Sequence, residues 1–262
     1  DSIGEGTYVI TATDTNGCQT TQTVIITEPD SLVSNYTTTE WNGYNIQCNG
    51  SDNGEITMNV TGGIDSLPYI YEIDGTPNGS NIFSFLSEGT YVITATDDNG
   101  CNTTQTVDMN APDSAIVLTY TTSDYNGEGV SCHGKTDGFI NTSVEGGVLD
   151  YIFLWSTLDT TSNIDSIGFG TYIVTVTDAN GCEASDTIEV TEPDEYTSSY
   201  ELEDYNTFGV SCNGSTDGSI DITVEGGTAP YSYLWSTGET TQDLDSIGEG
   251  TYVITATDTN GC

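Results

Sequence analysis

Hydrophobic and polar residues alternate along much of this chain. Between residues 220 and 224, isoleucine and valine alternate with aspartate and threonine, and between 231 and 235 aromatic residues take every second position. A period of two is typical of a strand with one face in a core and the other in water. Threonine, valine, isoleucine and tyrosine favour strands, and 30 glycines mark turns, so the sequence predicts an all-β protein. Trp155 and Trp235 fall on the predicted core face.

The alternation recurs with a period of about 80 residues. Asp245–Cys262 repeats Asp1–Cys18 residue for residue, and related copies end at Cys101 and Cys182. A unit of this length is a small domain, so the chain is expected to be a tandem array, like beads on a string. Because no autonomous domain would be cut at these points, we expect the sequence to be a piece of a longer periodic protein.

Pro-Asp pairs are expected to mark the junctions, because each proline follows a strand and has acidic neighbours. The pairs begin at Pro29, Pro112 and Pro193. The predicted domains are a partial repeat over 1–29, complete repeats over 30–112 and 113–193, and a repeat over 194–262 that lacks its last strand.

Seven short strands are expected in each complete repeat. An opening polar strand leads to a short strand ending in cysteine (NIQC or GVSC), then to the alternating strand and the aromatic strand. A later strand ends in a hydrophobic residue, a glycine turn and a tyrosine, which is the pattern of the tyrosine corner in sandwich domains. The expected fold is a tandem array of immunoglobulin-like seven-strand β-sandwich domains.

Charge narrows the possible partners. The chain has 41 acidic residues against the single Lys135, a formal net charge of −40. Nucleic acid and anionic membrane surfaces are therefore excluded as partners, since phosphate binding needs lysine and arginine. Acidity of this degree can indicate disorder, but 16 tyrosines, 6 phenylalanines and 3 tryptophans in regular alternation indicate a packed core instead. No apolar run approaches the roughly 18 residues that span a bilayer.

Seven cysteines recur in register, which predicts disulfides and an oxidising, extracytoplasmic location; reduced structural cysteines are the alternative. In seven alternating strands, both cysteine-bearing loops of a repeat fall at the same end. This parity favours pairing within each repeat: Cys48–Cys101, Cys132–Cys182 and Cys212–Cys262, with Cys18 joined to an upstream repeat. The other tidy scheme crosses the junctions: Cys18–Cys48, Cys101–Cys132 and Cys182–Cys212. The choice depends on the strand count.

Catalytic chemistry finds little support, so we do not expect an enzyme. The chain has one histidine, His133, and one lysine, so no repeated nucleophile-histidine site can exist. His133 follows Cys132 directly, but a surface turn residue beside a disulfide explains it better than a reactive pair.

Calcium is the more serious candidate for a bound ligand. The motif D-x-N-G precedes each closing cysteine, and carboxylate and amide oxygens suit Ca²⁺. The same motif is also a good tight turn, and no full calcium-loop signature is present. The candidate ligands are Asp14, Asn16, Asp97, Asn99, Asp178, Asn180, Asp258 and Asn260.

The run from Cys212 to Cys262 resembles the SprB-type repeats of Bacteroidota cell-surface adhesins. The specific matches are C-x-G, GG-x-x-PY, LWS, GTY and D-x-NGC. The resemblance implies a very long protein exported by the type IX secretion system and associated with gliding motility. It implies a filament at the cell surface that contacts substrata, polysaccharide or other copies of itself. The alternative is a passive stalk or sheath with the adhesive function elsewhere.

The resemblance also implies O-glycosylation of an extracellular glycoprotein. The known Bacteroidota pattern is Asp, then Ser or Thr, then a small set of mostly apolar residues. The matching positions are Ser2, Ser31, Ser66, Ser114, Thr160, Ser166, Thr187 and Ser246. Recurrence at one strand-turn position makes Ser2, Ser166 and Ser246 the best candidates.

Overall fold

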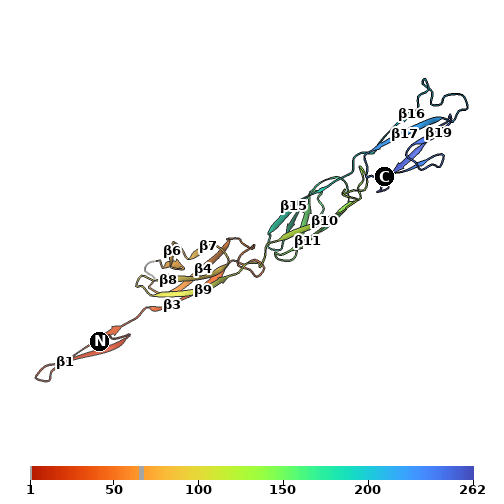
Figure 1. The fold of residues 1–262 in the computed structure, drawn as a ribbon. Helices are drawn as coiled ribbons and strands as arrows, with labels where there is room; N and C mark the ends of the chain where they lie inside the picture. Colours follow the sequence, from red (N-terminus) through yellow and green to blue (C-terminus); the bar gives the residue numbers. More distant parts are fainter. Residues whose placement is uncertain (1, 65–67) are drawn as a thin grey trace. The chain divides into compact units, whose positions relative to one another are not determined.

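The protein consists of two compact units, Asp1–Ala115 and Ile116–Cys262 (Figure 1). A computed structural model describes residues 2–64 and 68–262. These residues form strands, turns and irregular segments without a helix, which confirms the all-β prediction.

The first unit opens with a two-stranded hairpin and continues with a sandwich. The hairpin pairs β1 (Gly6–Thr13) with β2 (Gln19–Ile26). The sandwich has one sheet in the order β3-β4-β7 and a second in the order β6-β5-β8-β9. Its strands are β3 (Asp30–Thr38), β4 (Gly54–Gly63), β5 (Ile70–Ile73), β6 (Thr76–Asn78), β7 (Ile82–Leu86), β8 (Gly89–Thr96) and β9 (Asn102–Met109).

The second unit contains two consecutive repeats. The first corresponds to the predicted repeat over 113–193, three residues of which fall in the first unit, and pairs β10-β11-β13 in one sheet and β12-β14-β15 in the other. The next corresponds to the predicted repeat over 194–262 and pairs β16-β17-β19 and β18-β20. The strands are β10 (Val117–Thr122), β11 (Gly138–Glu145), β12 (Ile152–Trp155), β13 (Asn163–Ile167), β14 (Gly170–Thr177), β15 (Glu183–Val190), β16 (Thr197–Leu202), β17 (Gly218–Glu225), β18 (Ser232–Trp235), β19 (Leu244–Ile247) and β20 (Ile254–Thr257).

Each repeat has its own hydrophobic core, and the alternating and aromatic strands supply much of it. In the repeat over 113–193, Ile140, Trp155 and Val174 are buried in one cluster. Trp235 holds the position of Trp155 in the next repeat and is also buried. The prediction that both tryptophans are core residues is confirmed. The indole nitrogen of each donates to a backbone oxygen, of Thr161 or Thr241, so the polar atom is satisfied.

The tyrosine corner is present in every copy of the GTY motif. The hydroxyl groups of Tyr8, Tyr91, Tyr172 and Tyr252 each donate to the backbone oxygen four residues earlier, over 2.9 to 3.1 Å. The bond spans only four residues, so it forms even in the hairpin. The motif therefore marks a local corner, as predicted.

The predicted strand that ends in cysteine does not form. The segments NIQC and GVSC are bends and turns, entered by the isolated bridges Trp41↔Tyr44, Tyr125↔Glu128 and Tyr205↔Phe208. The repeat over 30–112 reaches seven strands through β6, which follows a turn in the aromatic hairpin, and the repeat over 113–193 has six. The missing strand changes the positions of the cysteines.

Strand directions place the two cysteines of a repeat at opposite ends. Strand β12 is antiparallel to β14, and β13 is antiparallel to β11. The loop after β11 meets the turn after β14, where the backbone nitrogen of Val148 donates to Asp178, so β11 and β14 run the same way. Strands β12 and β13 therefore also share one direction. The chain crosses between the sheets there without reversing, which breaks the strict alternation that the sequence suggested.

Candidate functional site

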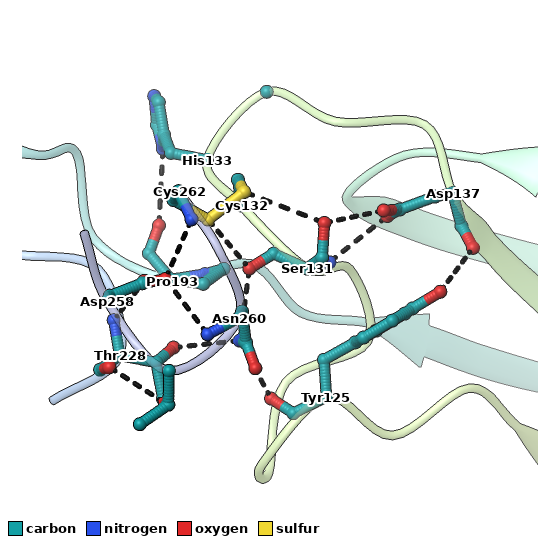
Figure 2. Close-up of a disulfide and its surroundings, with 12 residues drawn as sticks. Tyr125, Ser131, Cys132, His133, Asp137, Pro193, Thr228, Asp258, Asn260 and Cys262 are labelled. Carbon is teal, nitrogen blue, oxygen red and sulfur yellow. Dashed lines mark hydrogen bonds between the residues drawn. A yellow bond between two sulfur atoms is a disulfide. The ribbon is translucent and has the colours of Figure 1, made fainter. Parts of the chain in front are cut away.

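A disulfide joins the two consecutive repeats of the second unit. Cys132 lies in the repeat over 113–193 and bonds Cys262, which closes the next repeat, 130 residues later in the sequence (Figure 2). Their Cα atoms are 5.9 Å apart, within the usual range for a disulfide. This link is the most distinctive chemical feature of the described residues.

The expected pairing within repeats is wrong. Cys132 bonds Cys262 and not Cys182, Cys212 does not bond Cys262, and Cys101 does not bond Cys48. The alternative across the junctions is also wrong, because Cys18, Cys101 and Cys212 are free and exposed. Cys48 and Cys182 are disulfide-bonded.

The physical reason is the distance between the ends of a sandwich. Cys132 follows the loop in which the nitrogens of Gly129 and Val130 donate to the backbone oxygen of Thr191, just past the end of β15. Cys182 lies at the other end of that strand, before its first residue. Eight residues of extended strand cover about 27 Å, far beyond the reach of one disulfide. Cys132 can instead reach the near end of the repeat that follows.

Asp258 forms the turn that presents Cys262. Its Oδ1 accepts hydrogen bonds from the nitrogens of Asn260 and Cys262, both over 2.9 Å, and its Oδ2 accepts from the nitrogen of Thr228 over 2.8 Å. Burial would raise the pKa of Asp258, but these backbone donors outweigh burial and hold the pKa below its ordinary value. The carboxylate therefore stays ionised while it fixes the turn.

Asn260 bridges the two repeats beside the disulfide. Its Nδ2 donates to the backbone oxygen of Ser131 over 3.0 Å and to Thr228 Oγ1 over 3.1 Å, and its Oδ1 accepts from Asn126 over 2.6 Å. Figure 2 shows Asn260 directed toward Ser131 and Tyr125 of the preceding repeat. Sequence reasoning treated this asparagine as a metal ligand and missed its contact role.

Asp137 holds the other half of the link. It accepts from the backbone nitrogen of Ser131 over 3.0 Å and from the Ser131 hydroxyl. Both bonds lower the pKa of Asp137 below its ordinary value, and the bond from the hydroxyl has the larger effect. His133 Nδ1 lies 3.5 Å from Glu192 and 3.3 Å from the backbone oxygen of Pro193. His133 therefore sits at a turn against the junction, as expected from its sequence position.

The calcium candidates form turns in all four copies. Asp14, Asp97, Asp178 and Asp258 each accept through Oδ1 from the backbone nitrogens two and four residues later. Residues 2–64 and 68–262 contain no group of three or more histidine, cysteine, aspartate or glutamate side chains placed to hold a metal ion. The tight-turn interpretation thus explains the motif, and calcium stays a prediction.

The described glycosylation candidates are all exposed; Ser66 lies outside the described residues. Ser166 and Ser246 have positive φ values of 56° and 58° and lie in the bulge of β13 and β19, opposite the start of β11 and β17. This recurring backbone kink holds the two side chains on the surface of the sheet. Within the described residues, no helix is long and apolar enough to cross a membrane.

The fold and the disulfide define a class: all-β tandem sandwich repeats, with a covalent link between consecutive repeats. Residues 44–78 and 206–240 match the family model described as the SprB repeat. Each matched segment begins before Cys48 or Cys212 and ends just after the aromatic strand, β5 or β18.

Two solved structures resemble the chain weakly. One is titled "Crystal structure of tetra-tandem repeat in extending region of large adhesion protein" (15% identity, TM-score 0.22, covering 98% of this chain and 72% of that one). The other is an eight-domain immunoglobulin fragment of Down Syndrome Cell Adhesion Molecule (9% identity, TM-score 0.24, covering 98% and 51%). No curated protein matches the chain.

Proposed function

We propose that this chain is part of a cell-surface adhesin filament that contacts substrata or polysaccharide and carries tension between its repeats. The SprB repeats support the adhesin class, as the resemblance to gliding-motility adhesins implies, and type IX secretion would export such a protein. The disulfide supports an oxidising extracellular location, because such bonds seldom persist in the cytosol. The net charge of −40 suits a filament that stays soluble and unaggregated.

The observation that carries the mechanical part is the Cys132–Cys262 bond. A force applied across this link passes through two sulfur atoms and bypasses residues 133–261. The junction around Pro193 and most of the core residues of both repeats then lie in a protected loop. Closing a loop of 130 residues also stabilises the folded repeats by about 5 kcal/mol on the chain-entropy model. A passive stalk would need the same property, so this observation also favours the second candidate.

Adhesion assays separate the two candidates. Beads coated with the full chain should bind a polysaccharide-coated surface more than beads coated with a sandwich protein of equal charge, and the binding should survive physiological salt. Binding no greater than that of the control would leave the passive stalk. Intact-mass measurement of the native protein tests the glycans: masses above the bare polypeptide support modification, and the bare mass contradicts it.

Single-molecule pulling tests the tension-bearing role. Cys48 and Cys182 are changed to serine so that their disulfide chemistry does not interfere. In that background, the additional Cys132→Ser change should lengthen the fully extended chain by about 450 Å, because about 130 residues are released at about 3.5 Å each. A Cys212→Ser change is the matched control and should leave the length unaltered. Equal lengths for both variants would contradict the protected loop.

A further inference from the structure

The repeat over 113–193, which has a further repeat on either side, carries an open sheet edge. Strand β12 is the outermost strand of its sheet, and within residues 2–64 and 68–262 it pairs with β14 alone. The backbone nitrogen of Ser156 donates to the backbone oxygen of Ile173 in β14. Because the direction of hydrogen bonding alternates along a strand, the backbone N–H and C=O of Phe153 point away from β14. In the described part of the chain, Phe153 thus offers a free donor and acceptor at the edge.

The repeat over 30–112 shows what such an edge can hold. Strand β5 corresponds to β12, because each pairs in the same register with the strand of the GTY motif, β8 or β14. The outer edge of β5 is covered by the short antiparallel strand β6. Tyr71, the counterpart of Phe153, pairs with Asn78 of β6. A strand of polypeptide therefore fits at this position of the sandwich.

Apolar side chains border the open edge on the exposed face of the sheet. Ile152 and Leu154 are 67% and 53% exposed, whereas Phe153 between them packs against the core. Ile173 of β14 lies diagonally opposite Leu154 on the same face and is also exposed. A strand added to β12 would bury apolar side chains of its own against this patch of Ile152, Leu154 and Ile173.

A further exposed leucine lies in the turn after β12. Bonds of 2.9 Å from the nitrogen of Trp155 to the oxygen of Asp159, and from the nitrogen of Leu158 to the oxygen of Trp155, close this turn. Leu158 has a φ of 72°, which side chains other than glycine rarely adopt, and it is 81% exposed. Gly238 holds the same position in the next repeat. A strained, exposed leucine where glycine suffices indicates a contact role.

The charges beside β12 indicate what kind of segment fits. Exposed Asp150 precedes the strand and exposed Asp159 follows its turn, so both ends of the edge are acidic. Lysine or arginine at the two ends of an added segment would be complementary. A second copy of this chain, with a single lysine, no arginine and a net charge of −40, has no such segment.

We propose that the edge of β12 binds an extended polypeptide segment of a partner protein, with alternating apolar residues and basic residues at both ends. The segment pairs antiparallel with β12, in the place that β6 takes beside β5, and covers Ile152 and Leu154. Backbone hydrogen bonds supply affinity and the alternating side chains supply specificity, as in other strand additions to a sheet edge. This inference does not depend on adhesion.

A synthetic peptide in which valine and threonine alternate between pairs of lysines probes the edge directly. The experiment uses the full chain with Cys18, Cys101 and Cys212 changed to serine, so that exposed thiols cannot cross-link it. At physiological salt, the peptide should slow amide hydrogen exchange at Phe153 at least tenfold. Tyr71 is the matched control, because β6 already pairs with it, and its exchange should not change. No slowing at Phe153 with millimolar peptide would overturn the proposal.

Variants and control peptides separate strand addition from the attraction of any basic peptide to an acidic chain. Ile152→Ser and Leu158→Gly introduce the residues of the next repeat, Ser232 and Gly238, at matched positions, so the doubly substituted chain should fold and bind the peptide at least tenfold more weakly. A peptide with a central proline, which blocks backbone pairing, should not protect Phe153. Protection by the proline peptide, or undiminished binding to the double variant, would overturn the proposal. Self-association that protects Phe153 without peptide would instead assign the edge to a second copy and also overturn it.

Discussion

The first and last 18 residues of the chain share one sequence but lie in different surroundings. Residues 2–18 belong to a two-stranded hairpin, whereas Asp245–Cys262 belongs to a sandwich and ends in a disulfide. The tyrosine corner forms in both, over 2.9 and 3.0 Å, and so do the Oδ1 bonds of the D-x-N-G turn. These features are local, and they survive a change of partners.

The burial of the strand's side chains and the third hydrogen bond of the D-x-N-G turn depend on the neighbouring elements. Ile10 is 58% exposed in the hairpin, and its counterpart Ile254 packs against a core. Oδ2 of Asp258 accepts from Thr228, while in the described part of the chain Oδ2 of Asp14 accepts no hydrogen bond. The sequence of a turn thus decides its shape, and the neighbouring loop decides how much stability it contributes.

The largest expected difference is between Asp258→Ala and Asp14→Ala. Asp258→Ala removes three accepted bonds at a buried site and should lower the free energy of unfolding of the second unit by about 3 kcal/mol. Asp14→Ala acts on an exposed hairpin and should leave that unit's unfolding unchanged. Thermal unfolding of both variants measures this difference in stability. Equal losses in the two variants would contradict the view that the neighbouring loop decides how much the turn contributes.

Acid should weaken the second unit through the same carboxylate. The pKa of folded Asp258 lies below the unfolded value of 3.8, so its contribution is complete above that pH and is lost as the pH falls through the folded pKa. Denaturant unfolding should show stability falling below about pH 4. Asp258→Asn should flatten this dependence.

The pKa of Asp221 is raised by Asp243, so Asp221→Asn should stabilise the unit near neutral pH.

Asn260→Ala should have a smaller effect than Asp258→Ala. It removes the bonds to Ser131, Thr228 and Asn126, which should cost about 1–2 kcal/mol while the disulfide still forms. Asn16→Ala is the matched control in the identical sequence and should cause no measurable loss in the free energy of unfolding. An equal loss in both variants would show that the asparagine acts within its own turn.

Tyr8→Phe and Tyr252→Phe should give the smallest effects. Each loses one local hydrogen bond, worth about 1 kcal/mol. Amide exchange of the following residues should rise by a similar factor in both copies. The two 18-residue copies have the same sequence, so peptides that lie wholly within them have equal mass and cannot be told apart. The peptides used for the exchange measurement must therefore extend forward to residue 26 in the first copy, or back to residue 240 in the last. A rise in one copy alone would mean that the corner is not local.

The sequence sufficed for features that depend on nearby residues. Period-two alternation predicted the core positions of Ile140 and Trp155, and the GTY motif predicted the tyrosine corner. The predicted disulfide pairing was wrong because the pairing depends on strand direction. The segment GVSC has the composition of a strand but folds as a turn, and this changed the strand count on which the prediction rested. The crossing from β12 to β13 leaves no signal in residue alternation, so the position of Cys132 could not be predicted.

The most direct test is a non-reducing Asp-N digest of the native protein. Cleavage before aspartate separates the relevant cysteines, because Cys18 then lies in residues 14–29 and Cys262 in residues 258–262. The Cys132–Cys262 link predicts a species that joins residues 124–136 to residues 258–262 and that disappears on reduction. A species joining residues 124–136 to residues 178–185 would contradict the covalent link between consecutive repeats.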